Sequence, residues 1–432
     1  MTKTPRNVIL LSFDALRADH LGCYGYERDT SPNLDSFAEE NLQFLNAYSA
    51  SSHTREAVPA LLTGEYPDVA IDANYHLATD TIASTLSEEG SNVATALAGE
   101  GVQTAGFHSN PFVSRAYGFD RGFDTFDDDL HFGSNKVVAL AQRAFDKLRN
   151  RHYARADEIN ERSLSWLDSL DDGQPFFLWS HYMDTHGPYE PPGEYRQLYA
   201  DADISNGEAQ SLYQRAIKDP ESITDDERQL LIDLYDSEIR YNDEKIGVFL
   251  DELRERGLLD QSLIVVTADH GDAFGEHGYY EHPRYLHDEI THVPLLVRSP
   301  GGDEGTVSTS VSTLDIAPTV TSETDSTEGF EGESLHTLED SDRTMFMQAR
   351  GENEHSHVRR YALRAQAGAC FCERDRDAEE ISFSDCASDV LRERLESHVE
   401  ARVRRENGDE ATEADDVDEE IDRRLEALGY KE

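Results

Sequence analysis

The chain has 432 residues, and 38% of them are hydrophobic, so it can bury a sizeable core and is not a disordered chain. Charge is its unusual property: 39 Lys and Arg residues stand against 88 Asp and Glu residues, which gives a formal net charge of −49. This balance argues against a nucleic-acid-binding protein, because phosphate backbones need a positive surface.

The positive residues are almost all arginine. The lysines are Lys3, Lys136, Lys147, Lys218, Lys245 and Lys431. An acid-rich, Lys-poor surface suits a protein that stays hydrated in molar salt, where a Debye length of about 3 Å screens self-repulsion. We therefore expect a protein of a salt-loving cytoplasm, with an acidic mesophilic protein as the alternative.

Neither the start of the chain nor its apolar runs indicate export or membrane insertion. Met1 to Asn7 lead into a short apolar run without a signal-peptide pattern, and no stretch of about 18 apolar residues exists. The cysteines are too few for a disulfide scaffold, and the C-x-C at Cys370 and Cys372 does not have the C-x-x-C spacing of zinc or redox sites. We expect a cytoplasmic protein without a membrane span.

Short apolar runs alternate with helical patterns along the chain, which predicts an α/β fold built on a mostly parallel sheet. The expected strands are Val8–Phe13, Val102–Phe107, Phe176–His181, Leu263–Ala268 and Val293–Val297. The expected helices are Lys136–Leu148, Ala154–Leu170 and Thr224–Arg256, where apolar residues recur at near-helical spacing.

The composition shifts from about Gly301 towards Ser, Thr, Asp, Glu and Gly, and the last forty or so residues are rich in acids and Arg. We expect a catalytic domain over residues 1–330. Residues 331–432 are expected to form a small C-terminal subdomain and an acidic helical tail, which includes Glu410–Asp422.

Two of the expected strands end in chemically useful residues. Asp14 follows the first apolar run, and Asp269 and His270 follow the run from Leu263. Ligands gather at the carboxyl ends of parallel strands, so these side chains are candidates for a divalent metal site. Either Asp could instead be a turn or helix N-cap residue.

A third candidate precedes a short apolar helix. In the segment Ser51–Gly64, the Thr54 hydroxyl falls near a helix N-terminus, where free N–H groups favour an anion. A hydroxyl beside a metal can act as a nucleophile. The alternative is that Thr54 merely caps the helix.

Several ordered motifs carry a resemblance to a known family. They are NVILLSFDALRADHLGCYG at 7–25, ALLTGEYP at 60–67, GFDRGFD at 118–124, HYMDTHGPY at 181–189, TADHGDAFGEHG at 267–278, VPLLV at 293–297 and LDIAPT at 314–319. Together they resemble the sulfatase family of the alkaline phosphatase superfamily. The resemblance implies a large mainly parallel sheet between helices, a smaller C-terminal subdomain, and a metal-dependent ester hydrolase site at the strand ends.

By motif position, the resemblance makes Asp14, Asp269 and His270 metal ligands. Thr54 falls where the family's nucleophile also touches the metal. The implied cofactor is one divalent cation, Ca²⁺, Mg²⁺ or Mn²⁺, and the chain is similar to a haloarchaeal-type member with Thr at the nucleophile position.

The chain also departs from the family's pattern. Authentic sulfatases convert a Cys or Ser at the position of Thr54 to formylglycine, and the Pro and Arg of their maturation signal fall here on Glu56 and Val58. The family's second metal-binding Asp is Ala15. Its sulfate contacts correspond roughly to Ser109, Pro111 and Pro283. These losses make the remaining set resemble the superfamily's phosphoester hydrolases and phosphotransferases with a hydroxyl nucleophile.

In the implied mechanism Thr54 attacks phosphorus or sulfur in line while an acid protonates the leaving group. The candidates for that acid are His186 and His181, with His277 and His282 as substitutes. Candidates for substrate binding are Asn110, His282 and Arg284. The expected substrate is a small-molecule or glycan ester.

Three functions remain open at this point. The first is a metal-dependent hydrolase of sulfuric or phosphoric esters. The second is a transferase that passes a phosphoryl or head group through a Thr54 adduct. The third is a catalytically weak family member that serves as a binding protein. A dinucleotide-binding protein fits poorly, because no G-x-G-x-x-G follows the first strand.

Overall fold

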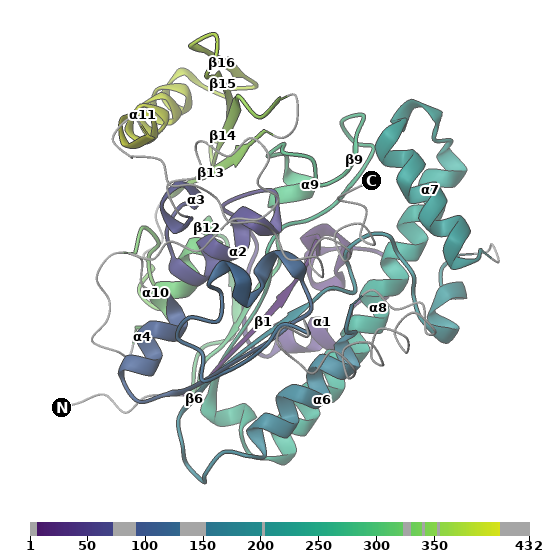
Figure 1. The fold of residues 1–432 in the computed structure, drawn as a ribbon, viewed down its shortest axis with the longest axis vertical. Helices are drawn as coiled ribbons and strands as arrows, with labels where there is room; N and C mark the ends of the chain where they lie inside the picture. Colours follow the sequence, from purple (N-terminus) through teal and green to yellow (C-terminus); the bar gives the residue numbers. More distant parts are fainter. Residues whose placement is uncertain are drawn as a thin grey trace.

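The structure is a computed structural model that describes residues 7–71, 92–129, 153–200, 204–322, 330–338, 342–351 and 355–406. An eight-stranded sheet in the order β11-β2-β10-β7-β1-β6-β4-β5 forms its centre (Figure 1). Its strands are β1 (Asn7–Phe13), β2 (Leu42–Phe44), β4 (Gln103–Phe107), β5 (Thr125–Asp127), β6 (Phe176–Tyr182), β7 (Ser262–Ala268), β10 (Leu295–Arg298) and β11 (Gly305–Val307).

Strands β1, β6 and β7 are rich in apolar residues and almost wholly buried, because both faces of this parallel part of the sheet are covered. Val8 of β1 pairs with Phe177 of β6 and with Leu263 of β7. The carboxyl ends of the three strands therefore meet at one edge. The run Val293–Val297 contributes β10, which pairs with β7 in the antiparallel sense, so the sheet is mixed.

Helices cover both faces of the sheet. Figure 1 shows α2, α4 and α10 on one side of β1 and α1, α6 and α8 on the other. The helices of the main body are α1 (Pro32–Glu39), α2 (Thr54–Thr63), α3 (Pro67–Ala70), α4 (Val93–Gly99), α6 (Ala156–Leu167), α7 (Asn206–Lys218), α8 (Asp225–Glu255), α9 (Asp288–Thr291) and α10 (Ile316–Val320).

Two of the predicted helices are present as α6 and α8. Helix α8 begins where the sequence has a capping box: the Thr224 side chain accepts from the backbone N–H of Glu227, and the Glu227 side chain accepts from the Thr224 backbone. The predicted helix Lys136–Leu148 lies outside the described residues, as does Glu410–Asp422 of the predicted tail.

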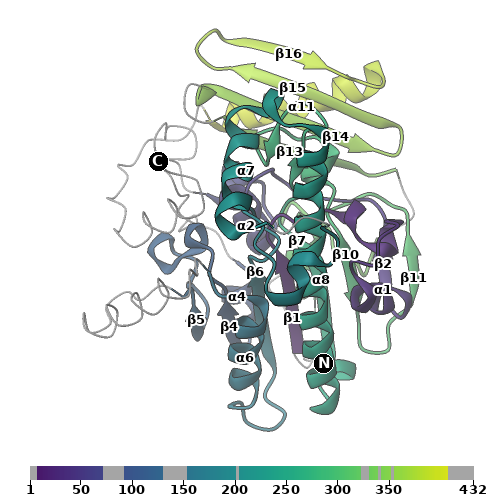
Figure 2. The ribbon, with the colours of Figure 1, turned by 90° about the vertical axis from the view of Figure 1, so that its right-hand side faces the viewer.

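A smaller antiparallel sheet lies across one end of the large sheet (Figure 2). Its strands run in the order β13 (Thr344–Arg350), β14 (Val358–Ala365), β15 (Gly368–Asp375) and β16 (Glu380–Ser384), and α11 (Asp389–Glu406) packs on β14 and β15. A disulfide joins Cys370 and Cys386, whereas Cys372 is buried and unpaired with another cysteine. The expected small C-terminal subdomain is therefore present.

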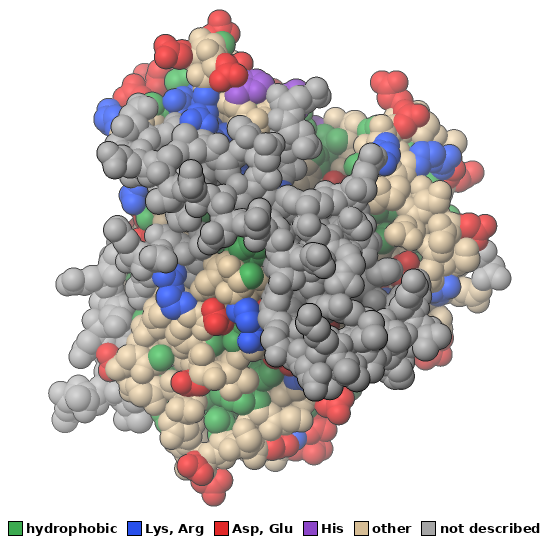
Figure 3. Space-filling model, viewed as in Figure 1, with side chains coloured by type: hydrophobic (Ala, Val, Ile, Leu, Met, Phe, Trp, Pro, Cys, Tyr) green, Lys and Arg blue, Asp and Glu red, His purple; other side chains and the backbone are tan. Residues whose placement is uncertain are grey.

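Short strand pairs complete the fold near the strand ends. They are β3 (Ala47–Tyr48) with β12 (Val311–Ser312), and β8 (Ala273–Phe274) with β9 (Tyr280–Glu281). Within the described part of the chain, no helix has the length and apolar character needed to cross a bilayer. On the face shown in Figure 3, acidic side chains are spread over several elements and do not gather in one patch.

Candidate active site

Asp14 enters the site because the chain turns sharply at the end of β1. Ala15 has a left-handed backbone (φ 59°), an uncommon conformation for a residue with a Cβ. Three bonds hold this turn: Tyr235 Oη donates to the Ala15 carbonyl (2.7 Å), Thr185 Oγ1 donates to the Asp14 carbonyl (2.5 Å), and Ala15 N donates to Asp269 Oδ1 (3.3 Å). The turn therefore fixes Asp14 against the end of the neighbouring strand.

Asp269 and His270 follow β7 in the same way. His270 Nδ1 lies 2.9 Å from the Gly271 carbonyl oxygen, which can only accept, so Nδ1 carries a proton and Nε2 presents a lone pair. A Cβ at Gly271 would lie 2.3 Å from the Glu289 carbonyl oxygen, so only glycine fits beside the segment that carries α9. The small residue thus lets β7 end close to α9 and orients His270.

Thr54 is the first residue of α2, but it is not the cap. The N-cap is His53, whose ring Nδ1 accepts from Arg55 N (3.3 Å). The Thr54 hydroxyl lies instead 3.1 Å from His270 Nε2 and 3.5 Å from Asp14 Oδ2. The alternative that Thr54 only caps the helix is therefore wrong, and three distant segments meet at its oxygen.

In each of the carboxylates of Asp14 and Asp269, one oxygen is hydrogen-bonded and the other is left for a cation. Asp14 Oδ2 accepts from Asn110 Nδ2 (2.6 Å), and Asp269 Oδ1 accepts from His270 N (2.8 Å). The other oxygens, Asp14 Oδ1 and Asp269 Oδ2, are buried without a hydrogen-bond partner. Such orphaned oxygens are costly unless a ligand satisfies them. Asp14, Asp269 and His270 each offer an atom within 4.8 Å of the others, so the residues present fit one divalent cation.

The charges of Asp14 and Asp269 also favour a bound cation. Burial raises the pKa of Asp14, but the imidazoles of His186, His181 and His270 outweigh burial and hold that pKa below its usual range. Burial and the charge of Asp14 raise the pKa of Asp269. Two buried carboxylates this close repel each other, and a cation between them relieves that repulsion.

His181, on β6, contacts the candidate metal ligand Asp14. Trp179 Nε1 donates to Ser12 Oγ (2.9 Å), so the Ser12 hydrogen is available for His181 Nδ1, also at 2.9 Å. With that bond, Nε2 carries the imidazole proton and faces Asp14 Oδ2 at 3.4 Å. The arrangement orients Asp14 from the strand next to its own.

A cluster of imidazoles lines the rest of the site. The ring of His282 lies 4.4 Å from that of His270, 5.0 Å from that of His53 and 5.1 Å from that of His186, between ring centroids. Burial, His270 and His186 lower the pKa of His282, whereas for His186 the charges of Asp14, Asp272 and Glu281 outweigh burial and raise the pKa. His186 is therefore the imidazole suited to carry a proton and His282 the one suited to stay neutral.

His186 also has a defined orientation. Its Nδ1 lies 2.6 Å from the Gly187 carbonyl oxygen, so Nε2 is the atom that gains or loses the second proton. Asp272, two residues beyond His270, is buried and accepts from Tyr189 Oη. Burial raises the pKa of Asp272 to about 7.

Arg284 contacts the first turn of α2 through Glu56. Its Nη1 donates to Glu56 Oε1 (2.9 Å), Arg350 Nε lies 3.3 Å from the same oxygen, and Ser51 Oγ donates to Oε2 (2.8 Å). Glu56 and both arginines are buried. Two guanidinium groups therefore meet one carboxylate at the first turn of the helix that carries Thr54.

The structure thus brings most of the predicted residues together. Gathered at the strand ends and the start of α2 are Asp14, Thr54, Asn110, His181, His186, Asp269, His270, His282 and Arg284. His277 is different: its side chain is about half exposed, and its ring contacts His287 and Glu289. Sequence reasoning missed His53, Glu56, Asp272 and Arg350 as site residues.

Comparisons with known proteins show the family and the fold. The sulfatase family matches residues 6–326. An arylsulfatase of Clostridium perfringens is 27% identical over 375 residues, which cover 73% of this chain and 74% of that protein. A phosphonate monoester hydrolase of Agrobacterium radiobacter has a TM-score of 0.70 at 17% identity and covers 93% of this chain and 96% of its own. A protein solved with its substrate D-glucosamine-2-N,6-O-disulfate has a TM-score of 0.69 at 18% identity, over 94% and 99%.

The fold defines an α/β protein with the alkaline-phosphatase-like architecture. The chain belongs to the sulfatase family and is a sulfatase-like ester hydrolase.

Proposed function

We propose that the chain cleaves sulfuric or phosphoric esters with Thr54 as the nucleophile, in a site that holds one divalent cation. The observation that carries the proposal is the position of Thr54 Oγ1, 3.1 Å from His270 Nε2 and 3.5 Å from Asp14 Oδ2, beside two orphaned carboxylate oxygens. A hydroxyl used only to cap a helix would have no reason to lie there.

Asp14, Asp269 and His270 would hold the cation, and Ca²⁺, Mg²⁺ and Mn²⁺ all accept carboxylate oxygens. When bound, a divalent cation lowers the pKa of a nearby hydroxyl and offsets the negative charge of an ester group. The chain's own residues position the nucleophile: α2 places the Thr54 hydroxyl within reach of His270 Nε2 and Asp14 Oδ2.

Turnover requires two covalent steps at Thr54. Thr54 gives up its hydroxyl proton to water, and its oxygen forms a bond to sulfur or phosphorus as the bond from that atom to the leaving oxygen breaks. The leaving alcohol takes a proton. We assign this proton to His186, because its ring lies beside that of His282 at the edge of the site and, besides Asp14, the charges of Asp272 and Glu281 raise its pKa. Water then releases the sulfate or phosphate and restores the Thr54 hydroxyl. His181, bonded to Ser12 and facing Asp14, orients the ligand set.

The substrate would be an anionic ester of a small molecule or glycan. Arg284 and Arg350 bring two guanidinium groups to the first turn of the Thr54 helix, and the ring of His282 lies beside that of His270. The charged ester group would lie against these residues and Asn110. Relatives that act on sulfate esters and on phosphonate monoesters share the fold, in keeping with either ester class.

The high content of acidic residues supports a second proposal, on the salt concentration at which the protein works. We infer that the protein works at high salt, because a net charge of −49 repels itself strongly unless counterions screen it. On the face shown in Figure 3, acidic side chains are visible at several separate places.

The test is a turnover panel in concentrated salt with an aryl sulfate, an aryl phosphate, a phosphodiester and a phosphonate monoester. Each is assayed with Mg²⁺, Mn²⁺ or Ca²⁺. We expect cation-dependent release of the alcohol from at least one ester. Release that an added acceptor alcohol stimulates, with transfer of the group to it, would indicate a transferase. No turnover under any condition would contradict the proposal and favour a binding role.

A further inference from the structure

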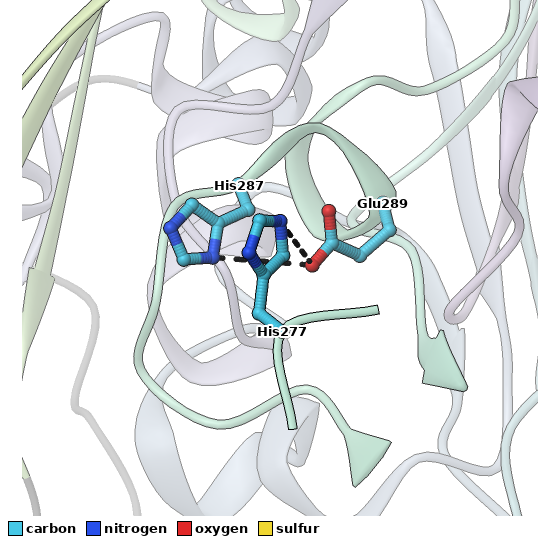
Figure 4. Close-up of side chains that lie close together, drawn as sticks. All are labelled: His277, His287 and Glu289. Atoms are coloured by element: carbon cyan, nitrogen blue, oxygen red, sulfur yellow. Dashed lines mark ion pairs between the residues drawn. The ribbon is translucent and has the colours of Figure 1, made fainter. Parts of the chain in front are cut away.

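A second cluster of metal-ligating side chains lies outside the site described above (Figure 4). His277 follows β8, His287 is the residue before α9, and Glu289 lies within α9. His277 Nε2 lies 3.5 Å from Glu289 Oε1, and His287 Nδ1 lies 3.9 Å from the same oxygen. Figure 4 shows both rings presenting a nitrogen to that carboxylate.

The charge of Glu289 lacks an ordinary counterion. Its side chain is only 7% exposed, and among the described residues its ion pairs are with the two imidazoles alone. Tyr279 Oη adds a hydrogen bond to Oε1 (2.8 Å) and lies 2.6 Å from His287 Nδ1. With both rings neutral, this buried carboxylate has only hydrogen bonds to offset its charge, and a bound cation would supply the positive charge.

The rings of His277 and His287 are stacked on each other. The centroids of His277 and His287 lie 3.9 Å apart with 24° between the planes. Two imidazolium ions would repel each other at this distance, so at least one of the two rings is neutral. Neutral imidazoles are instead the form that binds metals.

We propose that His277, His287 and Glu289 bind a transition-metal ion of the Zn²⁺ type. Tetrahedral Zn²⁺ with bonds of about 2.0–2.2 Å holds its ligand atoms about 3.4 Å apart, close to the separations of 3.5 and 3.9 Å seen here. Two nitrogens and one oxygen suit Zn²⁺, whereas Mg²⁺ and Ca²⁺ prefer oxygen ligands alone. The Tyr279 hydroxyl lies beside His287 Nδ1 and Glu289 Oε1. It would either bind the ion as a further oxygen ligand or move away when the ion binds.

The position of this site gives the ion a structural role. Its ligands stand at the two ends of the loop that carries β9, His282 and Arg284, so a bound ion would tie the loop closed. The same segment contacts the small subdomain, because Arg364 Nε donates to Asp288 Oδ1 (2.6 Å) and the rings of His287 and Phe371 lie 5.2 Å apart. The ion would fix the substrate-facing loop where the two sheets meet.

Zinc stoichiometry of the full-length protein tests the site independently of activity. Metal-free protein is loaded with Zn²⁺, freed of excess by gel filtration, and its zinc content is measured per chain. A protein carrying Asp14→Asn and Asp269→Asn removes the other candidate site and should keep about one equivalent. Adding His277→Ala should abolish that equivalent, whereas adding His357→Ala, another surface histidine paired with a carboxylate, should not.

A labelling experiment on the wild-type chain guards against variants that misfold. Diethyl pyrocarbonate modifies exposed imidazoles, and peptide mass spectrometry reports each histidine separately. We expect Zn²⁺ to reduce modification of His277 at least several-fold and to leave His357 unchanged. Equal zinc content with and without His277→Ala, or equal labelling of His277 with and without Zn²⁺, would overturn the proposal.

Discussion

The Thr54 hydroxyl oxygen lies 3.1 Å from Nε2 of His270, although 216 positions separate the two residues in sequence. The contact exists because β7 ends beside β1 and the start of α2 faces the same edge of the sheet. His270 Nδ1 is occupied by the Gly271 carbonyl, so Nε2 must face Thr54 and the two carboxylates. A hydroxyl, an imidazole and two aspartates are thereby held in one buried place.

Removal of divalent cations should abolish turnover. The orphaned oxygens of Asp14 and Asp269 lose their charge partner when a chelator is added, and re-addition of the cation should restore the rate. We expect Asp269→Asn to weaken cation binding on the order of a hundredfold, as measured by titration of activity against free cation. Asp375→Asn, at a surface carboxylate of the small subdomain, is the control. Full activity in the chelator would contradict this account.

The pH dependence of turnover should show the deprotonation of His186. Since its folded pKa is raised above 6.5, His186 stays protonated below that raised value and loses its proton as pH increases through it. The rate constant kcat/KM should therefore fall at alkaline pH. His186→Gln should remove this limb and lower the rate about a hundredfold with a poor leaving group, but much less with a nitrophenol. An unchanged alkaline limb in His186→Gln would assign the acid elsewhere.

Glu56→Gln should destabilise the protein, because it removes the buried carboxylate that pairs with both Arg284 and Arg350. Breaking a buried ion pair on one side costs about 3 kcal/mol in the free energy of unfolding. The matched control is Asp288→Asn, which breaks the Arg364 pair at a carboxylate that is 65% exposed and should cost at most about 1 kcal/mol. Denaturant unfolding measures both. Equal losses would mean that burial of the Glu56 pair has no energetic consequence.

Salt should stabilise the folded chain. With a formal net charge of −49, repulsion between carboxylates opposes folding at low ionic strength, and the Debye length falls from about 10 Å at 0.1 M to about 3 Å at 1 M. We expect Tm to rise steadily as NaCl increases from 0.1 M to molar concentrations. A Tm that is flat or falls over this range would favour the acidic mesophilic alternative.

Much of the site could be predicted because its ligands directly follow apolar runs. Asp14 ends the run of β1 and Asp269 ends that of β7, and parallel strands bring such positions together. The direction of β10 could not be predicted from its run Val293–Val297. It depends on the segment after β7, where β8, β9 and α9 all lie between the end of β7 and the start of β10 and return the chain in the opposite sense.

Other site residues carry no local signal at all. Arg350 belongs to β13 of the small sheet and reaches Glu56 only through the packing of the subdomain on α2. Glu56 could be noted in the sequence only as a departure at a position where the family has Pro. His53 is the N-cap of α2, a role that sequence rules assign more readily to Ser, Thr, Asp or Asn.

The most direct test of the account compares Thr54→Ser with Thr54→Val on the ester that the panel identifies. Valine keeps the shape of threonine without its hydroxyl, and serine keeps the hydroxyl. We expect Thr54→Ser to retain measurable turnover and Thr54→Val to lose at least about a thousandfold in kcat, with a covalent mass increase on Thr54 in acid-quenched wild-type protein. Turnover by Thr54→Val at the wild-type rate would contradict the central claim.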